Sequence, residues 1–184
     1  MGVLFGAQDR LTSDVCREVF SYRRKVFVEH LGWPLSVQNG EELDEFDRDD
    51  TVYVVMNDVD GDVVGCARLL PTTKPYLLGS VFPQLLNGRE LPCSPDVWEL
   101  SRFAAVDFNA KHNLQASQCS SEATIDLLNH SVACAVDRGA KRLITVSPIG
   151  VERLLRKTEY ATHRAGPPVI VNGEAVVACW IEIS

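Results

Sequence analysis

Several features of common protein classes are missing from this sequence. No apolar run in its 184 residues reaches the length of about 18 residues that a membrane helix needs. The start MGVLFGAQDR lacks the basic and long apolar regions of a secretory signal. The six cysteines form no CxxC pair, which argues against a zinc or dithiol site and favours free buried thiols. These absences predict a cytoplasmic protein with no membrane partner.

Positive charge is also scarce. The 18 Lys and Arg against 25 Asp and Glu give a net charge of 18 − 25 = −7, which disfavours nucleic acid as a partner. The four histidines lack metal-ligand spacing, and there is no GxSxG elbow or P-loop. We therefore expect no metal site.

The charges that are present are unevenly placed. Seven acids and one Arg stand between Gly40 and Asp50, whereas seven Lys or Arg and two Glu stand between Arg138 and Arg164. Two interpretations are open at this point. The two stretches are either solvated surfaces, or an acidic wall for a cationic ligand and a basic patch for an acidic partner.

Hydrophobic periodicity and turn residues predict the order of the elements. In the first half we expect a helix capped by Ser13 and ended by Gly32, a polar loop over 36–50, two strands over 51–56 and 63–70 that turn at Asp60-Gly61, and a short helix within 76–90. In the second half we expect a strand over 97–106, a helix from Ser120 or Ser121 to Gly139, a strand over 141–147 and a helix over 151–157. The last two strands, over 169–184, turn at Asn172-Gly173. This order predicts a single α/β domain over 1–184, a three-layer α-β-α sandwich with a mixed, largely antiparallel central sheet.

Two charges interrupt the strand VWELSRFAAV, residues 97–106, which otherwise reads as buried. A charge removed from water is costly unless it is paired and hydrogen-bonded. On a regular strand Glu99 and Arg102 point to opposite faces, so they pair directly only if a bulge re-aims one of them. Otherwise each needs a partner from elsewhere in the chain.

Four more charged residues can supply those partners. Arg68 ends an apolar strand, Arg23 lies near the apolar side of the first helix, and Asp44 and Asp47 stand three apart in the acidic loop. Taken singly, Arg68 can reach water by its long side chain, and the two acids can belong to a solvated loop. Taken together, the residues predict one polar network around a cleft, where perturbed carboxylates are functional candidates.

The element order with a central strand–helix–strand crossover is similar to the N-acetyltransferase fold. Those enzymes hold the coenzyme A pyrophosphate with a Gly-rich loop after the central strand. The corresponding stretch here, VDFNAKHNLQASQCSSEA at 106–123, contains no glycine. A standard acyl-CoA acetyltransferase is therefore disfavoured.

Dispersed motifs in one order identify a family. They are RxxVF at 23–27, LGW at 31–33, ELDEFD at 42–47, ARLLPTT at 67–73, VFPQLL at 81–86 and WELSRFA at 98–104. In these motifs the chain resembles the acyl-homoserine-lactone synthases, the autoinducer synthases of bacterial quorum sensing, over nearly its whole length. The resemblance implies an acyltransferase with two substrates, S-adenosylmethionine and an acyl chain on acyl carrier protein, or on coenzyme A in some relatives, and no cofactor. The alternative is an acyl-CoA-dependent N-acyltransferase acting on another amine.

The resemblance also implies roles for the charged residues. Glu99 is the expected base, acting through a water, on the amine of S-adenosylmethionine. Asp44 and Asp47 suit the cationic substrate, and Arg23 or Arg102 can hold its carboxylate. Arg68 is expected to hold the network together by pairing with an Asp.

Further residues are expected at the substrates. Trp33, Phe27 and Phe103 can pack the adenine and the sulfonium, Phe82 belongs to a family motif, and backbone N–H groups beside Ser101 or Phe103 can stabilise the oxyanion. Thr145 and Ser147 are expected along an apolar tunnel for the acyl chain, for which bulky apolar residues suggest a medium length. Arg153, Arg156 and Lys157 are the predicted contacts to the acidic carrier protein.

Overall fold

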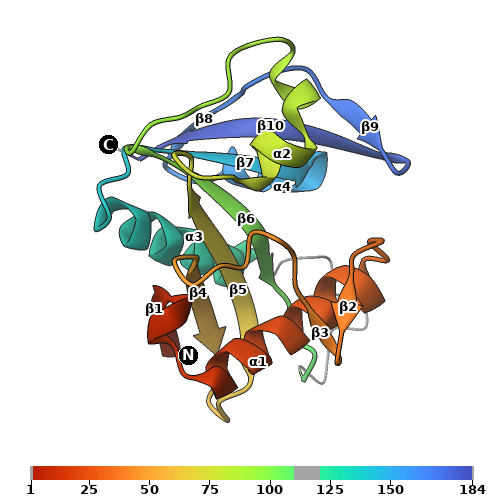
Figure 1. The fold of residues 1–184 in the computed structure, drawn as a ribbon, viewed down its shortest axis with the longest axis vertical. Helices are drawn as coiled ribbons and strands as arrows, with labels where there is room; N and C mark the ends of the chain where they lie inside the picture. Colours follow the sequence, from red (N-terminus) through yellow and green to blue (C-terminus); the bar gives the residue numbers. More distant parts are fainter. Residues whose placement is uncertain (1, 110–120, 184) are drawn as a thin grey trace. The chain divides into compact units, whose positions relative to one another are not determined.

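The computed structural model describes residues 2–109 and 121–183 of the chain (Figure 1). It divides into two compact units, Met1–Arg68 with Arg102–Ser131 and Leu69–Ser101 with Val132–Ser184. We call these unit 1 and unit 2 and describe each by itself. The predicted extent of one domain over 1–184 stays a prediction.

The elements follow the predicted order, with additions. They are β1 (Gly2–Ala7), η1 (Gln8–Arg10), α1 (Ser13–Arg23), η2 (Arg24–His30), β2 (Val37–Gln38), β3 (Glu41–Glu42), β4 (Val52–Asn57), β5 (Val63–Pro71), α2 (Leu77–Val81), η3 (Pro83–Leu86), β6 (Val97–Ala105), α3 (Ser121–Val136), β7 (Arg142–Pro148), α4 (Ile149–Leu155), β8 (Ala161–Arg164), β9 (Val169–Val171) and β10 (Glu174–Glu182).

Most strands join one mixed sheet. The hydrogen-bonded order is β1-β4-β5-β6-β7-β10-β8, with β9 also paired to β10. The pairs β1–β4, β7–β10, β8–β10 and β9–β10 are antiparallel, whereas β6 and β7, joined through α3, are parallel. This is the predicted parallel crossover within a largely antiparallel sheet, and the mixed α/β prediction is confirmed.

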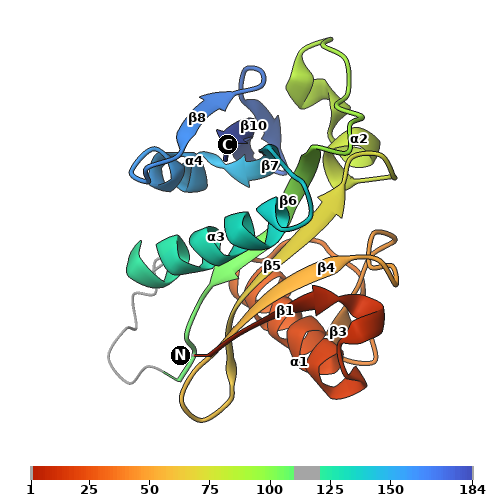
Figure 2. The same ribbon diagram turned by 90° about the vertical axis from the view of Figure 1, so that its left-hand side faces the viewer.

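Unit 1 begins with a strand and a helix that differ from the prediction. Strand β1 was not expected, and Figure 2 shows β4 lying between it and β5. The cap of α1 is Thr12 rather than Ser13, because the Thr12 hydroxyl accepts the N–H of Val15 at 3.3 Å. The helix then continues as the π-helix η2, which ends before Gly32. Single π turns are frequent at functional sites.

The polar stretch over 36–50 is not simply a loop. It contains the hairpin β2–β3, turned by Asn39 and Gly40 with φ values of 53° and 83°. The hairpin places Glu42 in a fully buried position. This one placement brings a third carboxylate to the network described below.

Unit 2 is built around β10. Its hairpin with β9 turns at Asn172-Gly173, whose φ values of 50° and 83° match the predicted turn. The short strand β8 was not expected, and it pairs with the other end of β10. Helix α4 packs on β7 and β10.

The cysteines differ in part from the expectation of free buried thiols. The five within the described residues are free, and Cys66, Cys134 and Cys179 are buried. Cys16 is half-buried, however, and Cys93 is exposed. Cys119 lies outside the described residues.

Candidate active site

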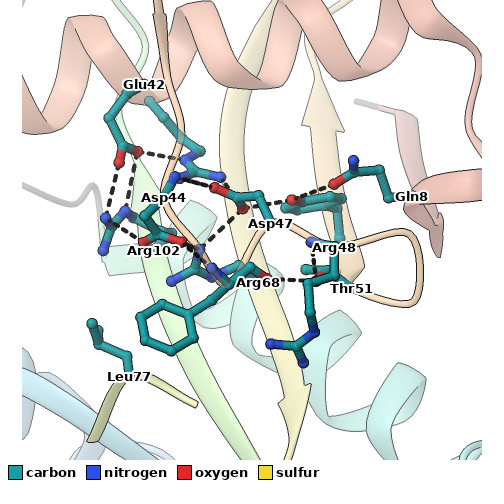
Figure 3. A network of polar contacts seen from close by, with 12 residues as sticks. Gln8, Glu42, Asp44, Asp47, Arg48, Thr51, Arg68, Leu77 and Arg102 are labelled. Carbon is teal, nitrogen blue, oxygen red and sulfur yellow. Dashed lines mark hydrogen bonds and ion pairs between the residues drawn. The ribbon is translucent and has the colours of Figure 1, made fainter. Parts of the chain in front are cut away.

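Three arginines and three carboxylates of unit 1 form one network (Figure 3). Its members are Arg23 from α1, Glu42 from β3, Asp44 and Asp47 from the following loop, Arg68 from β5 and Arg102 from β6. The formal charges of these six side chains cancel. Five of the six were predicted, and the structure brings those five together.

Asp47 is the centre of the network. Arg23 donates Nη1 to Oδ1 at 2.7 Å and Nη2 to Oδ2 at 2.9 Å, and Arg68 donates Nη1 to Oδ1 at 3.0 Å. The backbone N–H of Asp44 adds a bond of 2.8 Å to Oδ2. Burial raises the pKa of Asp47, but the charge and hydrogen bonds of Arg23, aided by Arg68 and Tyr53, outweigh it and hold that pKa well below the usual range.

Glu42 connects two of the arginines. Its Oε2 accepts Arg23 Nε at 2.6 Å and Arg102 Nε at 3.1 Å, and its Oε1 accepts Arg102 Nη2 at 2.9 Å. Burial raises the pKa of Glu42, yet the hydrogen bonds and charges of the two arginines lower it overall. Glu42 is therefore held ionised, as the partner that Arg102 needed.

A local irregularity of β6 explains how Arg102 reaches this network. Arg102 has a φ of 48°, in the left-handed region that a non-glycine residue rarely adopts. Such a residue breaks the regular alternation of a strand, as a bulge does. On a regular strand, alternation would put Glu99 and Arg102 on opposite faces, but β6 is not regular at Arg102. Arg102 pairs with Glu42 and Asp44 instead of Glu99.

Only part of the network reaches the surface of unit 1. The side chains of Arg23, Arg68 and Asp47 are 0% exposed, whereas Asp44 is 21% and Arg102 is 5% exposed. All three guanidinium nitrogens of Arg23 already donate to Glu42 or Asp47. Within the described part of the chain, Arg102 Nη1 has no hydrogen-bond partner, since only its Nε and Nη2 donate. Of the two arginines predicted for a ligand carboxylate, the geometry thus favours Arg102.

Two of the predicted aromatic residues stack on each other, and one of them, Phe27, lies beside Arg102. The rings of Phe27 and Trp33 stack with centroids 5.1 Å apart, and the Arg102 guanidinium lies over Phe27 at 5.8 Å. Trp33 is half-buried, so part of its ring is accessible. Phe103 is also half-buried in unit 1.

Glu99 lies in unit 2 and is fully buried. Its Oε2 accepts the backbone N–H of Leu77 at 2.9 Å, and Oε1 accepts that of Leu78 at 2.6 Å. These bonds fix the carboxylate at the start of α2. Burial, together with the nearby charge of Glu99, raises the pKa of Tyr76 to about 12.

The remaining predicted residues of unit 2 are also placed. Ser101 is buried, and Phe82 is half-buried at the end of α2. Thr145 and Ser147 are buried on β7 with their hydroxyl oxygens 3.1 Å apart. Arg153, Arg156 and Lys157 are exposed on α4 and the turn after it, as a contact surface for a partner requires.

Two residues were missed from the sequence, Glu42 in the network and Tyr53, which binds the network at Asp47. Glu42 stands two residues before Asp44, so an extended segment puts both on one face, but the same spacing links Glu45 to Asp47 and does not single out Glu42. Tyr53 Oη lies 2.6 Å from Asp47 Oδ1 and 3.0 Å from Gln8 Oε1. A phenol has one proton, and the shorter contact, to the charged Asp47 carboxylate, is the stronger of the two hydrogen bonds open to it.

Replacing Tyr53 by Phe tests this contact. The variant keeps the ring packed against Phe20 but removes the bond to a charged acceptor, so we expect unfolding to become easier by about 1.5–3 kcal/mol. Urea unfolding monitored by circular dichroism measures the loss. Gln8→Ala, which removes only the second partner of the phenol, should cost about 1 kcal/mol or less. Equal stability of Tyr53→Phe and the parent protein would contradict the hydrogen-bonded role.

Within 2–109 and 121–183, no group of three or more His, Cys, Asp or Glu is placed to hold a metal ion. Among the same residues, no helix is long and apolar enough to cross a membrane.

The fold is similar to that of proteins with little sequence identity to this chain. A Lactobacillus plantarum protein assigned as an N-acetyltransferase aligns over 100% of this chain and 98% of its own with a TM-score of 0.65 and 16% identity. This likeness shows the fold alone, and it confirms the predicted similarity to N-acetyltransferases.

The sequence is similar to those of one family of enzymes. The autoinducer synthase family profile matches residues 7–184. An acyl-homoserine-lactone synthase from Acinetobacter nosocomialis is 52% identical over 183 residues, covering 100% of both chains. Among solved structures, TofI in a ternary complex with an inhibitor and MTA is 46% identical, with a TM-score of 0.87 over 100% of this chain and 92% of that one. BjaI, a CoA-dependent acyl-homoserine lactone synthase solved with SAM and isopentyl-CoA, is 26% identical, with a TM-score of 0.84 over 100% and 84% of the two chains. This chain therefore belongs to the autoinducer synthase family, the acyltransferases that make the acyl-homoserine lactones of quorum sensing.

Proposed function

We propose that the chain makes an N-acyl-L-homoserine lactone from S-adenosylmethionine and an acyl chain carried on acyl carrier protein, and releases 5′-methylthioadenosine. One observation carries the proposal. In a member of this family, a charge-balanced network presents one partly exposed carboxylate, Asp44, beside the buried guanidinium of Arg102, whose Nη1 has no hydrogen-bond partner among the described residues. S-adenosylmethionine carries the complementary groups, an ammonium and a carboxylate.

The binding proposal follows from which charged groups of the network are exposed, as Asp44 is, or have an atom without a hydrogen-bond partner among the described residues, as Arg102 has. Asp44 attracts the cationic end of the substrate, and Arg102 Nη1 binds its carboxylate. The stacked pair of Phe27 and Trp33 offers an aromatic face for the adenine or the sulfonium. Arg23, Glu42, Asp47 and Arg68 hold these groups in place. The bound MTA in the TofI complex supports such a site in a related protein.

The proposed reaction has two steps and needs no further cofactor. The α-amine attacks the thioester carbon and its proton passes through a water to Glu99. The C–S bond of the thioester then breaks as the amide forms, and the leaving thiolate takes up that proton from Glu99 to become the free thiol. A free α-amine has a pKa near 8, so a mild base is sufficient. The substrate carboxylate then attacks the γ-carbon, and the C–S⁺ bond breaks with its electron pair going to sulfur. Backbone N–H groups beside Ser101 or Phe103 are the proposed donors to the oxyanion.

The acyl donor is the finer part of the proposal. BjaI is CoA-dependent, so the family contains enzymes of that kind. Here Arg153, Arg156 and Lys157 form an exposed basic surface in unit 2, which suits an acidic carrier protein. We further propose that Thr145 and Ser147 line the acyl site together with Phe82, that the chain is of medium length, and that the enzyme works in the cytoplasm.

A product assay tests the function. The purified protein is incubated with S-adenosylmethionine and matched panels of acyl carrier protein thioesters and acyl-CoA thioesters, and methylthioadenosine and the lactone are quantified. We expect both products, at the highest kcat/KM with a medium-chain carrier thioester. Amide formation without methylthioadenosine would instead indicate an N-acyltransferase acting on another amine. Turnover of acyl-CoA alone would overturn the proposed donor.

A further inference from the structure

A buried carboxylate of unit 2 binds two exposed arginines. Glu152 on α4 has a side chain that is 5% exposed. Arg164 on β8 donates Nε to Oε1 and Nη2 to Oε2, both at 2.8 Å, and Arg156 donates Nη2 to Oε1 at 2.8 Å. The hydrogen bond of Arg164, with that of Arg156, holds the pKa of Glu152 below its usual value. The bidentate geometry is that of a strong, charge-assisted pair.

The two arginines that Glu152 binds remain accessible. The side chain of Arg156 is 61% exposed and that of Arg164 is 39% exposed. Each therefore has one part held by Glu152 and another part facing solvent. Glu152 sets where these two positive groups stand, at a site where a helix and an edge strand meet.

The neighbouring cations share the same surface. Residues 153, 156 and 157 are three and four positions apart, so they lie on one side of α4 and its final turn. In the part of the chain that the structure describes, no carboxylate lies within ion-pair distance of Arg153 or Lys157. We name the four exposed cations Arg153, Arg156, Lys157 and Arg164 the basic surface.

We propose that Glu152 is a positioning residue for the acyl donor, because it holds Arg156 and Arg164 in the arrangement in which the basic surface binds an acidic carrier protein. The inference rests on the proposed donor. Long cationic side chains lose rotamer entropy when they bind a partner, and a buried acceptor that fixes them beforehand reduces that cost.

A purely electrostatic role for Glu152 predicts the opposite change in affinity for the carrier protein when the carboxylate is removed. If the carboxylate only offset positive charge, its removal would make the surface more basic and strengthen attraction to an acidic protein. If it positions the arginines, removal weakens binding although the net positive charge rises. The direction of the change therefore separates the two roles.

Glu152→Gln is the first test. With acyl carrier protein thioester varied at saturating S-adenosylmethionine, we expect KM for the thioester to rise about fivefold to tenfold. The KM for S-adenosylmethionine and kcat should stay within about twofold, since no group contacting that substrate changes. Arg164→Lys, which keeps the charge but loses the fork, should raise KM for the thioester in the same direction.

Glu182→Gln is the matched control. Glu182 accepts a bidentate pair from Arg142 in the same unit, outside the basic surface, so the KM for the thioester should not change. An unchanged or lower KM in both Glu152→Gln and Arg164→Lys, with carrier thioester used normally by the parent, would overturn the role of Glu152 and leave the donor in place. Use of acyl-CoA but not the carrier thioester by the parent would overturn the donor and the docking surface together.

Discussion

Replacing Glu99 by Gln is expected to lower kcat by about 10²–10³-fold, the usual contribution of a positioned general base. The substitution keeps the shape of the side chain and removes its ability to take a proton. The two N–H bonds from Leu77 and Leu78 hold the Glu99 carboxylate in one orientation, so the basic oxygens are fixed before substrate binds. Initial rates of methylthioadenosine release across pH 6–9 measure the effect.

A loss of structure at α2 has to be separated from a loss of chemistry. In the Gln variant the single amide oxygen can still accept one of the two N–H groups of Leu77 and Leu78, but the NH₂ group faces the other N–H as donor against donor. The thermal midpoint should therefore fall while KM for S-adenosylmethionine changes little. Glu90→Gln, at an exposed position of the same unit, should match the parent protein in both rate and stability. Parental rates of Glu99→Gln throughout pH 6–9 would rule out the general-base role.

The elements that were predicted correctly have local signals. Asp60-Gly61 and Asn172-Gly173 specify their hairpins by turn chemistry alone, without help from the rest of the chain. Strands β1 and β8 carry no such signal, because short edge strands depend on pairing with distant segments. The π-helix η2 was read as ordinary helix for a similar reason, since apolar spacing does not distinguish the two.

The residues of the site likewise divide into those with a local signal in the sequence and those that depend on the rest of the fold. Glu99, Arg102 and Arg68 could be found because a charge within an apolar strand violates the expected pattern. Glu42 could not be separated from the other acids between Gly40 and Asp50, because burial of one among seven depends on the β2–β3 hairpin. The positive φ of Arg102 likewise depends on tertiary context.

The geometry also changes the role expected of two residues. Arg23, as an alternative to Arg102, and Asp47, together with Asp44, were candidates for substrate contact. Arg23 and Asp47 are fully buried, however, and bind each other through two hydrogen bonds. Groups whose donors and acceptors are already used act better as a scaffold for accessible neighbours. We therefore infer that Asp44 and Arg102 contact the substrate directly, and that the buried members determine where those two stand.

Asp47→Asn is accordingly expected to have the largest effect on stability, about 3–5 kcal/mol. The substitution leaves Arg23 and Arg68 buried without their shared negative charge. It also places an NH₂ group where an Asp47 oxygen now accepts hydrogen bonds, for example opposite Arg23 Nη2 and the Asp44 N–H, so that donor faces donor. Urea unfolding at pH 7 measures the loss. Asp14→Asn is the matched control, because Asp14 is 82% exposed and its pair with Arg17 lies in solvent, where such pairs contribute about 0–1 kcal/mol.

The pH dependence of stability gives an independent measurement of the same carboxylate. An unfolded Asp titrates near pH 4, whereas the pKa of Asp47 in the folded protein is held well below that value, mainly by Arg23 against the opposing effect of burial. A depressed folded pKa means that this stabilisation is complete above about pH 5 and is lost progressively as the pH falls below about 4. The parent protein should therefore lose stability more steeply between pH 5 and pH 3 than Asp47→Asn, which has no proton to bind at this position. Parallel curves for the two proteins would mean that Asp47 does not titrate as a buried, arginine-paired acid, and the scaffold role inferred for it would then be wrong.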